Sequence, residues 1–218
     1  MAINVLYIHG MGGGGDSRIP SILRDAIKDQ ARLVVRTYDF DPEVAVRQID
    51  SWVKELKPEI VIGESLGSLH ALRIKGVHHI FVSPSLNAPL FFSRLSWLTL
   101  IPGVTSLMDM IYRPREGDRQ HLYFTYKVMR KYAAHRTAAL DNSIKKGSRD
   151  TFHAFFGTND HYRKSGIVSV RTWKKYFGSD SYELYEGTHF MEEEFIHEML
   201  VPAIKCVLDT VSDPLQES

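Results

Sequence analysis

Short apolar runs alternate with amphipathic segments along most of the chain, and this alternation limits the fold more than any other feature of the sequence. The apolar runs have the length of buried strands and lie at 3–8, 32–38, 59–63, 79–84, 151–157 and 181–187. Helical periodicity occupies the segments at 20–30, 42–56, 66–75, 165–178 and 192–211, the last with a kink expected at Pro202. Because strands in strict alternation with helices form a parallel sheet covered on both faces, we predict an α/β fold with a mostly parallel sheet of about six strands.

The alternation stops between Pro84 and Arg149, where aromatic and apolar residues continue without a clear strand. No linker or internal repeat separates the two parts, so we predict a single domain over residues 1–218 with a helical, cap-like insertion at about 84–149. Lys and Arg number 27 against 26 Asp and Glu. This balance gives no reason to expect a nucleic acid or an anionic membrane as a partner.

Several features that the sequence lacks limit the functional class. The single cysteine, Cys206, excludes an internal disulfide; we expect it to be buried and the protein to be cytoplasmic, without a signal peptide. The most apolar window, 95–108, is too short to span a bilayer. The sequence has no H-E-x-x-H or C-x-x-C motif, so we predict neither a metal nor an organic cofactor. No oligomeric state follows from the sequence.

The third apolar run ends in Gly63-Glu64-Ser65-Leu66-Gly67, and a helical segment follows at once. This G-x-S-x-G between strand and helix is the pattern of a nucleophile elbow, a sharp turn that lifts the serine hydroxyl clear of the sheet. Side chains two residues before and after the serine would collide in such a turn, so both positions require glycine. We predict Ser65 as a nucleophile and the Leu66 amide as a donor to an anion forming beside it.

A serine hydroxyl needs a base to take its proton and an acid to orient that base. Asp160 follows the apolar run at 151–157, and His189 follows the run at 181–187. Both therefore fall at carboxyl ends of predicted strands, in the order serine, acid, histidine. His161 is a weaker alternative base because it lies on the loop of the acid. Asp180 is a weaker alternative acid because it precedes its strand.

The stretch from Gly10 to Gly15 fits two interpretations. Gly10, Gly12 and Gly15 have the G-x-G-x-x-G spacing of a dinucleotide-binding loop, with Asp39 at a suitable distance to bind a ribose. In that fold, however, the helix begins within the glycine loop, whereas Pro20 here favours a later start. We therefore favour a loop that supplies a second oxyanion amide, from Met11 or, failing that, from Gly12.

Four motifs together, H-G-x-G-G after the first strand, G-x-S-x-G, G-x-x-D at Gly157–Asp160 and G-x-H-F at Gly187–Phe190, resemble the α/β-hydrolase superfamily. More narrowly, the chain is similar to small single-domain bacterial serine esterases. The resemblance implies Ser65 as nucleophile, His189 as base and Asp160 as its orienter, with Met11 and Leu66 as oxyanion donors. The sequence departs from the superfamily by starting at what would be its third strand, so we expect a sheet trimmed to about six strands.

The substrate site is predicted from the start of the insertion and from the neighbours of the oxyanion donors: Gly12, Glu64, Phe91, Phe92 and Trp97. The expected activity is hydrolysis of a small or medium carboxylic ester or thioester through an acyl-enzyme. Two alternatives stay open. One is a nucleotide-binding oxidoreductase that uses the loop at 10–15, and the other is a catalytically silent binding protein with a hydrolase fold.

Overall fold

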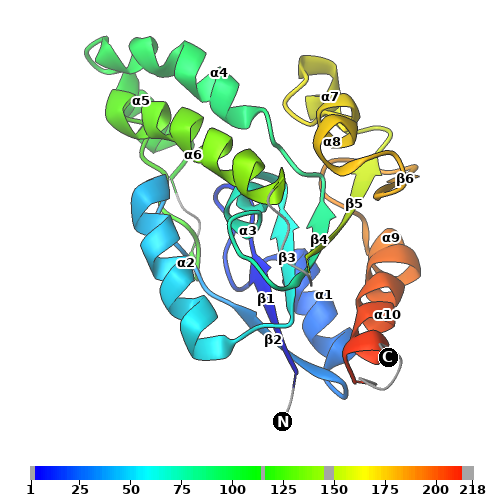
Figure 1. Ribbon diagram of the computed structural model, residues 1–218. Coiled ribbons are helices and arrows are strands. Elements are labelled where there is room, and N and C mark those ends of the chain that lie inside the picture. The colour runs from blue at the N-terminus through cyan, green and yellow to red at the C-terminus, as the bar shows by residue number, and fades with distance from the viewer. Residues whose placement is uncertain (1–2, 114–115, 145–149, 213–218) are drawn as a thin grey trace.

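The computed structural model describes residues 3–113, 116–144 and 150–212, and its centre is a six-stranded sheet in which every strand pair is parallel (Figure 1). The strands are β1 (Ile3–Ile8), β2 (Ala31–Val35), β3 (Ile60–Glu64), β4 (His78–Val82), β5 (Thr151–Gly157) and β6 (Tyr182–Tyr185). Their order across the sheet is β2-β1-β3-β4-β5-β6. Each overlaps one of the predicted runs, so the predicted α/β class and parallel sheet are confirmed.

The direction of the connections reverses between β1 and β3. From β1 the chain continues to β2 on one side, and from β3 it continues to β4 on the other. Loops that leave the carboxyl ends of these neighbouring strands therefore diverge, and ligands of parallel α/β sheets bind in the crevice formed there. The glycine-rich loop follows β1 and Ser65 follows β3, so both lie at this crevice.

Helices cover both faces of the sheet. The α-helices are α1 (Arg18–Ile27), α2 (Pro42–Leu56), α3 (Ser68–Ala71), α4 (Ala88–Leu95), α5 (Val104–Ile111), α6 (Tyr126–Ile144), α7 (His161–Ser165), α8 (Val170–Phe177), α9 (Glu193–Phe195) and α10 (Val201–Ser212). Two 3-10 turns, η1 (Ser65–Gly67) and η2 (Ser96–Leu100), and one π-helical turn, η3 (Ile196–Leu200), complete them. In the described ranges, no helix is both long and apolar enough to cross a membrane.

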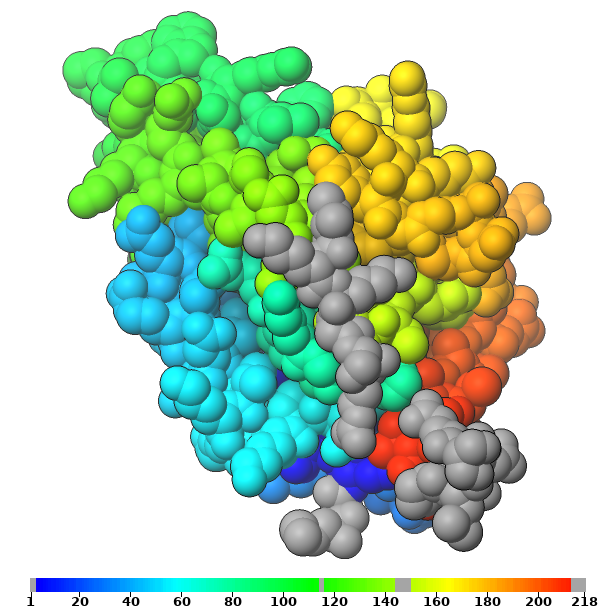
Figure 2. Space-filling view, viewed as in Figure 1, coloured from blue at the N-terminus to red at the C-terminus, as the bar shows by residue number. Residues whose placement is uncertain are grey.

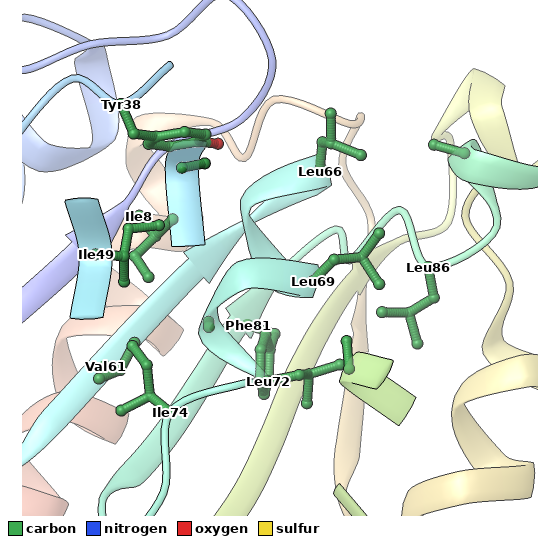
Figure 3. Close-up of a cluster of buried hydrophobic side chains, with 14 of the residues drawn as sticks. Ile8, Tyr38, Ile49, Val61, Leu66, Leu69, Leu72, Ile74, Phe81 and Leu86 are labelled. Atoms are coloured by element: carbon green, nitrogen blue, oxygen red, sulfur yellow. The ribbon is translucent and has the colours of Figure 1, made fainter. Parts of the chain in front are cut away.

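Successive side chains of each strand enter opposite cores, as the pleat of a strand requires. On β1, Leu6 and Ile8 pack with α2, α3, α6 and α8, whereas Val5 and Tyr7 pack with α1 and α10. Figure 3 shows part of the first core, in which Leu66 and Leu69 from the turns after β3 lie among side chains of the sheet and of α2. The helical segment that follows Ser65 is therefore fixed by buried leucines.

The described residues between β4 and β5 contain helices and irregular segments but no strand, and the helices differ in burial. Residues 114–115 and 145–149 of the predicted insertion lie outside the described residues. α6 buries Val128, Met129 and Tyr132 in the same core as α2 and α8, so it covers the sheet. α5 has no buried residue. α4 and α5 stand out at one end of the molecule, in green at the upper left of Figure 2.

Two local details differ from the sequence-based expectation and one agrees with it. The helix expected at 66–75 is much shorter: it begins as the 3-10 turn η1, and α3 ends at Ala71. The helix expected at 192–211 is interrupted by η3 next to the kink expected at Pro202, because proline lacks an amide and crowds the preceding turn. Cys206, expected to be buried, is exposed on α10.

Candidate active site

Ser65 lies at a strained turn between β3 and η1. Its φ is +48°, in the left-handed region that residues other than glycine rarely occupy. A Cβ at Gly63 would lie 2.9 Å from the Cβ of Ala71, and a Cβ at Gly67 would lie 2.3 Å from the carbonyl oxygen of His9. Both flanking glycines are thus required by close packing, for the steric reason that the motif predicts. The structure has the predicted elbow.

His189 lies between the other two predicted catalytic residues. Its Nε2 is 2.9 Å from the Oγ of Ser65, and its Nδ1 is 2.8 Å from Oδ2 of Asp160. A carboxylate only accepts hydrogen bonds, so the neutral ring donates from Nδ1 and leaves Nε2 free to accept the serine proton. His189 and Asp160 are 3% and 2% exposed, and this burial shields the pair from solvent.

Each carboxylate oxygen of Asp160 accepts a different hydrogen bond. While Oδ2 accepts from His189, Oδ1 accepts the amide N–H of Tyr162 at 2.8 Å and caps α7. The cap fixes the carboxylate, since both of its oxygens then have defined partners. An aspartate after a strand could be a helix cap or a partner of the histidine, and here it is both.

The loops that carry Asp160 and His189 press against each other. The amides of Thr158 and Asn159 donate to the carbonyl oxygens of Tyr185 and Gly187. A Cβ at Gly157 would lie 2.4 Å from the carbonyl oxygen of Gly187. The glycine of the G-x-x-D motif therefore allows two neighbouring strand ends to approach closely.

The alternative base and acid do not reach Ser65. His161 is exposed on α7, with its ring centre 6.2 Å from that of His189. Asp180 is exposed and lies at the amino end of β6, whereas Ser65 follows the carboxyl end of β3.

A second hydroxyl contacts the serine. The Oγ of Ser85, in the loop after β4, is 3.1 Å from the Oγ of Ser65, and Ser85 is buried. Its amide also donates to the carbonyl oxygen of Ser65 at 3.0 Å. Sequence reasoning missed Ser85, although its place just past a strand's carboxyl end is a signal that could have found it.

The glycine-rich loop approaches Ser65 through Gly10, where a Cβ would lie 3.0 Å from the Cβ of the serine. The Gly12 amide donates to Oε1 of Gln120 at 3.0 Å, so this alternative oxyanion donor already has a protein acceptor. Among the described residues, the Met11 amide has no such acceptor. The Leu66 amide belongs to the first helical turn, where amides lack intrahelical partners.

The same loop does not have the features of a dinucleotide site. α1 begins at Arg18, after the last glycine rather than within the loop. The amides of Gly14 and Gly15 donate to Oγ of Ser17 and to Oδ2 of Asp118. Amides that would receive a pyrophosphate are therefore bonded to the protein's own side chains, which disfavours the oxidoreductase alternative.

A cavity of about 580 Å³ opens at the crevice and contains Ser65 and His189 on its wall. Of the other predicted residues, Met11, Gly12, Glu64, Leu66 and Phe92 also line it. Phe91 and Trp97 are not among the described residues of its lining, and Trp97 is 57% exposed. The lining further includes side chains outside the predicted site residues: Ser17, Arg18, Ser85, Arg119, Tyr162, Ile167 and Phe190.

Glu64 is held beneath the glycine-rich loop. Its Oε2 accepts the Tyr7 hydroxyl at 2.8 Å and faces the Gly10 amide at 3.5 Å. Burial, with a smaller effect of the Glu64 carboxylate, raises the pKa of Tyr7 well above its ordinary value, so this hydroxyl keeps its proton. Glu64 thus connects the turn at Ser65 to β1 while it lines the cavity.

No three metal-ligating side chains within 3–113, 116–144 and 150–212 are grouped to hold a metal ion.

No protein-family model and no curated protein matches the sequence. A monoacylglycerol lipase of Paleococcus ferrophilus has a similar structure, with 17% identity, a TM-score of 0.60 and 94% of each chain covered. Est1E from Butyrivibrio proteoclasticus, solved with ferulic acid, is 16% identical with a TM-score of 0.65, over 97% of this chain and 90% of its own. Mouse α/β-hydrolase domain-containing protein 10 is 14% identical with a TM-score of 0.62, over 95% and 90%. This chain has the α/β-hydrolase fold.

Proposed function

We propose that the protein is a serine hydrolase that cleaves carboxylic esters or thioesters through an acyl-enzyme. The observation that carries the proposal is the continuous hydrogen-bonded chain from Ser65 through His189 to Asp160, with Ser65 and His189 on the wall of a cavity. Buried polar groups arranged in this order match the requirements of an activated nucleophile. The fold alone would not support the proposal, because one fold can carry many activities.

In the proposed reaction, Ser65 Oγ attacks the carbonyl carbon of the substrate while its proton passes to Nε2 of His189. The negative charge that develops on the carbonyl oxygen is received by the amides of Met11 and Leu66. The tetrahedral intermediate then collapses: the bond to the alcohol or thiol breaks, and His189 returns the proton to the leaving group. Water attacks the acyl-enzyme by the same route, releasing the acid and restoring Ser65.

The cavity supports a small or medium ester as the substrate class. Phe92 and Ile167 provide apolar contact area, while Arg18 and Arg119 provide polar groups at the same cavity. Two structures of similar fold are a monoacylglycerol lipase and a protein solved with ferulic acid, a carboxylic acid with an aromatic ring. Both favour carboxylic esters over other acyl compounds as first substrates to assay.

The test is covalent labelling followed by turnover. A fluorophosphonate should form an adduct on Ser65, located by mass spectrometry of peptides, and the adduct should be absent in Ser65→Ala. A panel of p-nitrophenyl esters of increasing acyl length should then show turnover that Ser65→Ala lacks. Folded protein without an adduct and without turnover would contradict the proposal and leave a silent binding protein as the alternative.

A further inference from the structure

A short segment that is distant from the glycine-rich loop in the sequence packs along that loop. The segment is 116–120, between α5 and α6, and the loop is 10–17, between β1 and α1. The contacts that join them are Gly12 N–H to Oε1 of Gln120 at 3.0 Å, the Gln120 N–H to the Gly13 carbonyl at 2.8 Å, Gly15 N–H to Oδ2 of Asp118 at 3.3 Å, and Arg119 to Asp16 at 3.0 Å and to Ser17 at 2.9 Å.

The approach is close enough to require glycine. A Cβ at Gly14 would lie 1.5 Å from the carbonyl oxygen of Asp118, and a Cβ at Gly15 would lie 2.8 Å from its carboxylate. The run of glycines beyond H-G-x-G-G therefore has a steric cause: it makes room for the segment 116–120. Glycines give an isolated loop many conformations, so something must select one of them.

Gln120 meets that need. It is 1% exposed, and its side chain bridges two strand ends: Oε1 accepts from Gly12, and Nε2 donates to the carbonyl oxygen of Tyr38 after β2 at 3.1 Å. The backbone N–H of Gln120 donates to the carbonyl oxygen of Gly13. The chain continues from Gln120 into Leu122 and Phe124, which are buried in the core. Gln120 is thus anchored by its own burial and by the buried residues that follow it, and the loop is hydrogen-bonded to it.

We propose that Gln120 is a positioning residue that sets the oxyanion loop, an inference that rests on the proposed function. The Gly12 nitrogen belongs to the peptide group that follows Met11. Holding Gly12 N–H fixes the peptide group next to that of the Met11 amide, and holding the Gly13 carbonyl fixes the peptide group two further along; together they restrict the direction of the Met11 amide. Gln120 also occupies the alternative donor, Gly12, which leaves Met11 to receive the oxyanion. Transition-state stabilisation depends on such donors being held in place before the reaction.

The decisive variant is Gln120→Met, which keeps the length of the side chain and removes both hydrogen bonds. We expect kcat on a p-nitrophenyl ester to fall by about 10- to 100-fold, with KM changed by less than about 3-fold, because a misdirected donor affects the transition state more than the bound substrate. Gln120→Glu retains an acceptor for Gly12 N–H and should recover part of kcat. Asn142→Leu, which removes an amide bond to the carbonyl oxygen of Leu72 far from the loop, is the matched control and should keep the wild-type kcat.

A second readout separates positioning from simple loss of stability. A trifluoromethyl ketone forms a tetrahedral adduct with an activated serine and places an oxyanion in the same site. Its affinity should fall in Gln120→Met by the same factor as kcat/KM, whereas Asn142→Leu should leave it unchanged. A folded Gln120→Met protein with wild-type kcat and ketone affinity would overturn the proposal, as would equal losses in Asn142→Leu. If Gln120→Met does not fold, Gln120→Glu is measured against the same control.

Failure of the proposed function gives a different result. In that case the wild-type protein forms no adduct on Ser65 and hydrolyses no ester. Amide hydrogen exchange then tests the role of Gln120 without activity: the peptide that contains Gly12 and Gly13 should exchange faster in Gln120→Met than in wild type or Asn142→Leu. Unchanged exchange would refute the positioning role.

Discussion

The two halves of the candidate site are held in different ways. Asp160 and His189 stand on neighbouring strand ends, β5 and β6, where short loops bond directly to each other and both side chains are buried. The glycine-rich loop instead depends on Gln120, more than a hundred residues away, and several of its residues are partly exposed. Asp160 and His189, the proposed acid–base half, are therefore held by the sheet. The loop 10–17, the proposed oxyanion half, is held by the segment 116–120. Changes to each half should have different consequences for activity and stability.

The largest expected effect is on the acid–base half. Asp160→Asn should lower kcat by about 10⁴-fold, because an amide no longer holds the histidine in the tautomer that accepts the serine proton. Stability should change little, since asparagine also caps a helix. Asp160→Ala should add a loss of about 1 kcal/mol from the missing cap of α7. Ester turnover and urea denaturation measure the two effects separately.

The exposed Asp180 is the control for this prediction, because Asp180→Asn also removes a carboxylate next to β6. It should leave kcat unchanged. A loss of kcat in Asp180→Asn comparable to that in Asp160→Asn would show that the acid had been assigned to the wrong residue.

One glycine from each half gives a second contrast. In Gly157→Ala the new Cβ would meet the Gly187 carbonyl in the interior between two strand ends, where neither backbone can move away. We expect a loss of about 2–4 kcal/mol in the free energy of unfolding. In Gly14→Ala the Cβ would meet the backbone carbonyl oxygen of Asp118, which lies in the exposed part of the segment, 116–118, whereas Gln120 is buried. Because the exposed part can shift, we expect a smaller loss, of about 1–2 kcal/mol, together with a loss of kcat as the loop moves.

Urea denaturation and ester kinetics on both variants provide the measurement. Equal losses of stability in Gly157→Ala and Gly14→Ala would contradict the contrast, because they would mean that the segment 116–120 is as rigid as the sheet. Loss of stability without loss of kcat in Gly14→Ala would show that the loop does not need its present position for catalysis.

Acid should weaken the core beneath the oxyanion half. His9 stacks on Tyr38, which contacts His70, and the ring of His70 lies 4.4 Å from that of His135. Burial lowers the pKa of His9 to about 4 and that of His135 to about 3, and burial together with the charge of His135 lowers the pKa of His70 well below its ordinary value. These histidines are therefore neutral in the folded protein throughout the neutral and weakly acidic range.

An unfolded chain protonates its histidines near pH 6.5, so between about pH 6.5 and 4 it binds protons that the folded chain does not. The free energy of unfolding is highest above this window. As the pH is lowered from about 6.5 to 4, it should decrease by up to about 1.4 kcal/mol per pH unit for each histidine. Urea denaturation at intervals from pH 7 to 4 measures the slope. His135→Phe should reduce it, and an identical slope in this variant would contradict the account.

The sequence could predict that Ser65, Asp160 and His189 lie together, because each of the signals is local. Ser65, Asp160 and His189 each follow a recognisable strand, and parallel strands bring their carboxyl ends to one edge of the sheet. Glycines at 63, 67 and 157 mark the close approaches that such turns require. The strands, their order of appearance and these three residues therefore follow from short-range patterns.

The contacts that hold the glycine-rich loop could not be predicted in the same way. Nothing near Gln120 or Asp118 in the sequence indicates that they lie against Gly12 and Gly14, because that contact depends on how the region between β4 and β5 folds back. The same limit applies to Phe91 and Trp97, which helical spacing could not place inside or outside the cavity. Ser85 was missed because a serine after a strand becomes informative only when its distance to Ser65 is known.

The smallest expected effect concerns the wall of the cavity that α4 provides. Phe92 lines the cavity, whereas Trp97 lies outside it on η2, with its side chain exposed. Phe92→Ala should lower kcat/KM for esters of long or aromatic acids by about 10-fold and leave acetyl esters within about 2-fold, since only large acyl groups would reach the lost ring. Trp97→Ala removes a larger side chain and should leave the profile of acyl length unchanged. A shift of that profile in Trp97→Ala would contradict the prediction, because it would mean that a side chain outside the cavity contacts the acyl group.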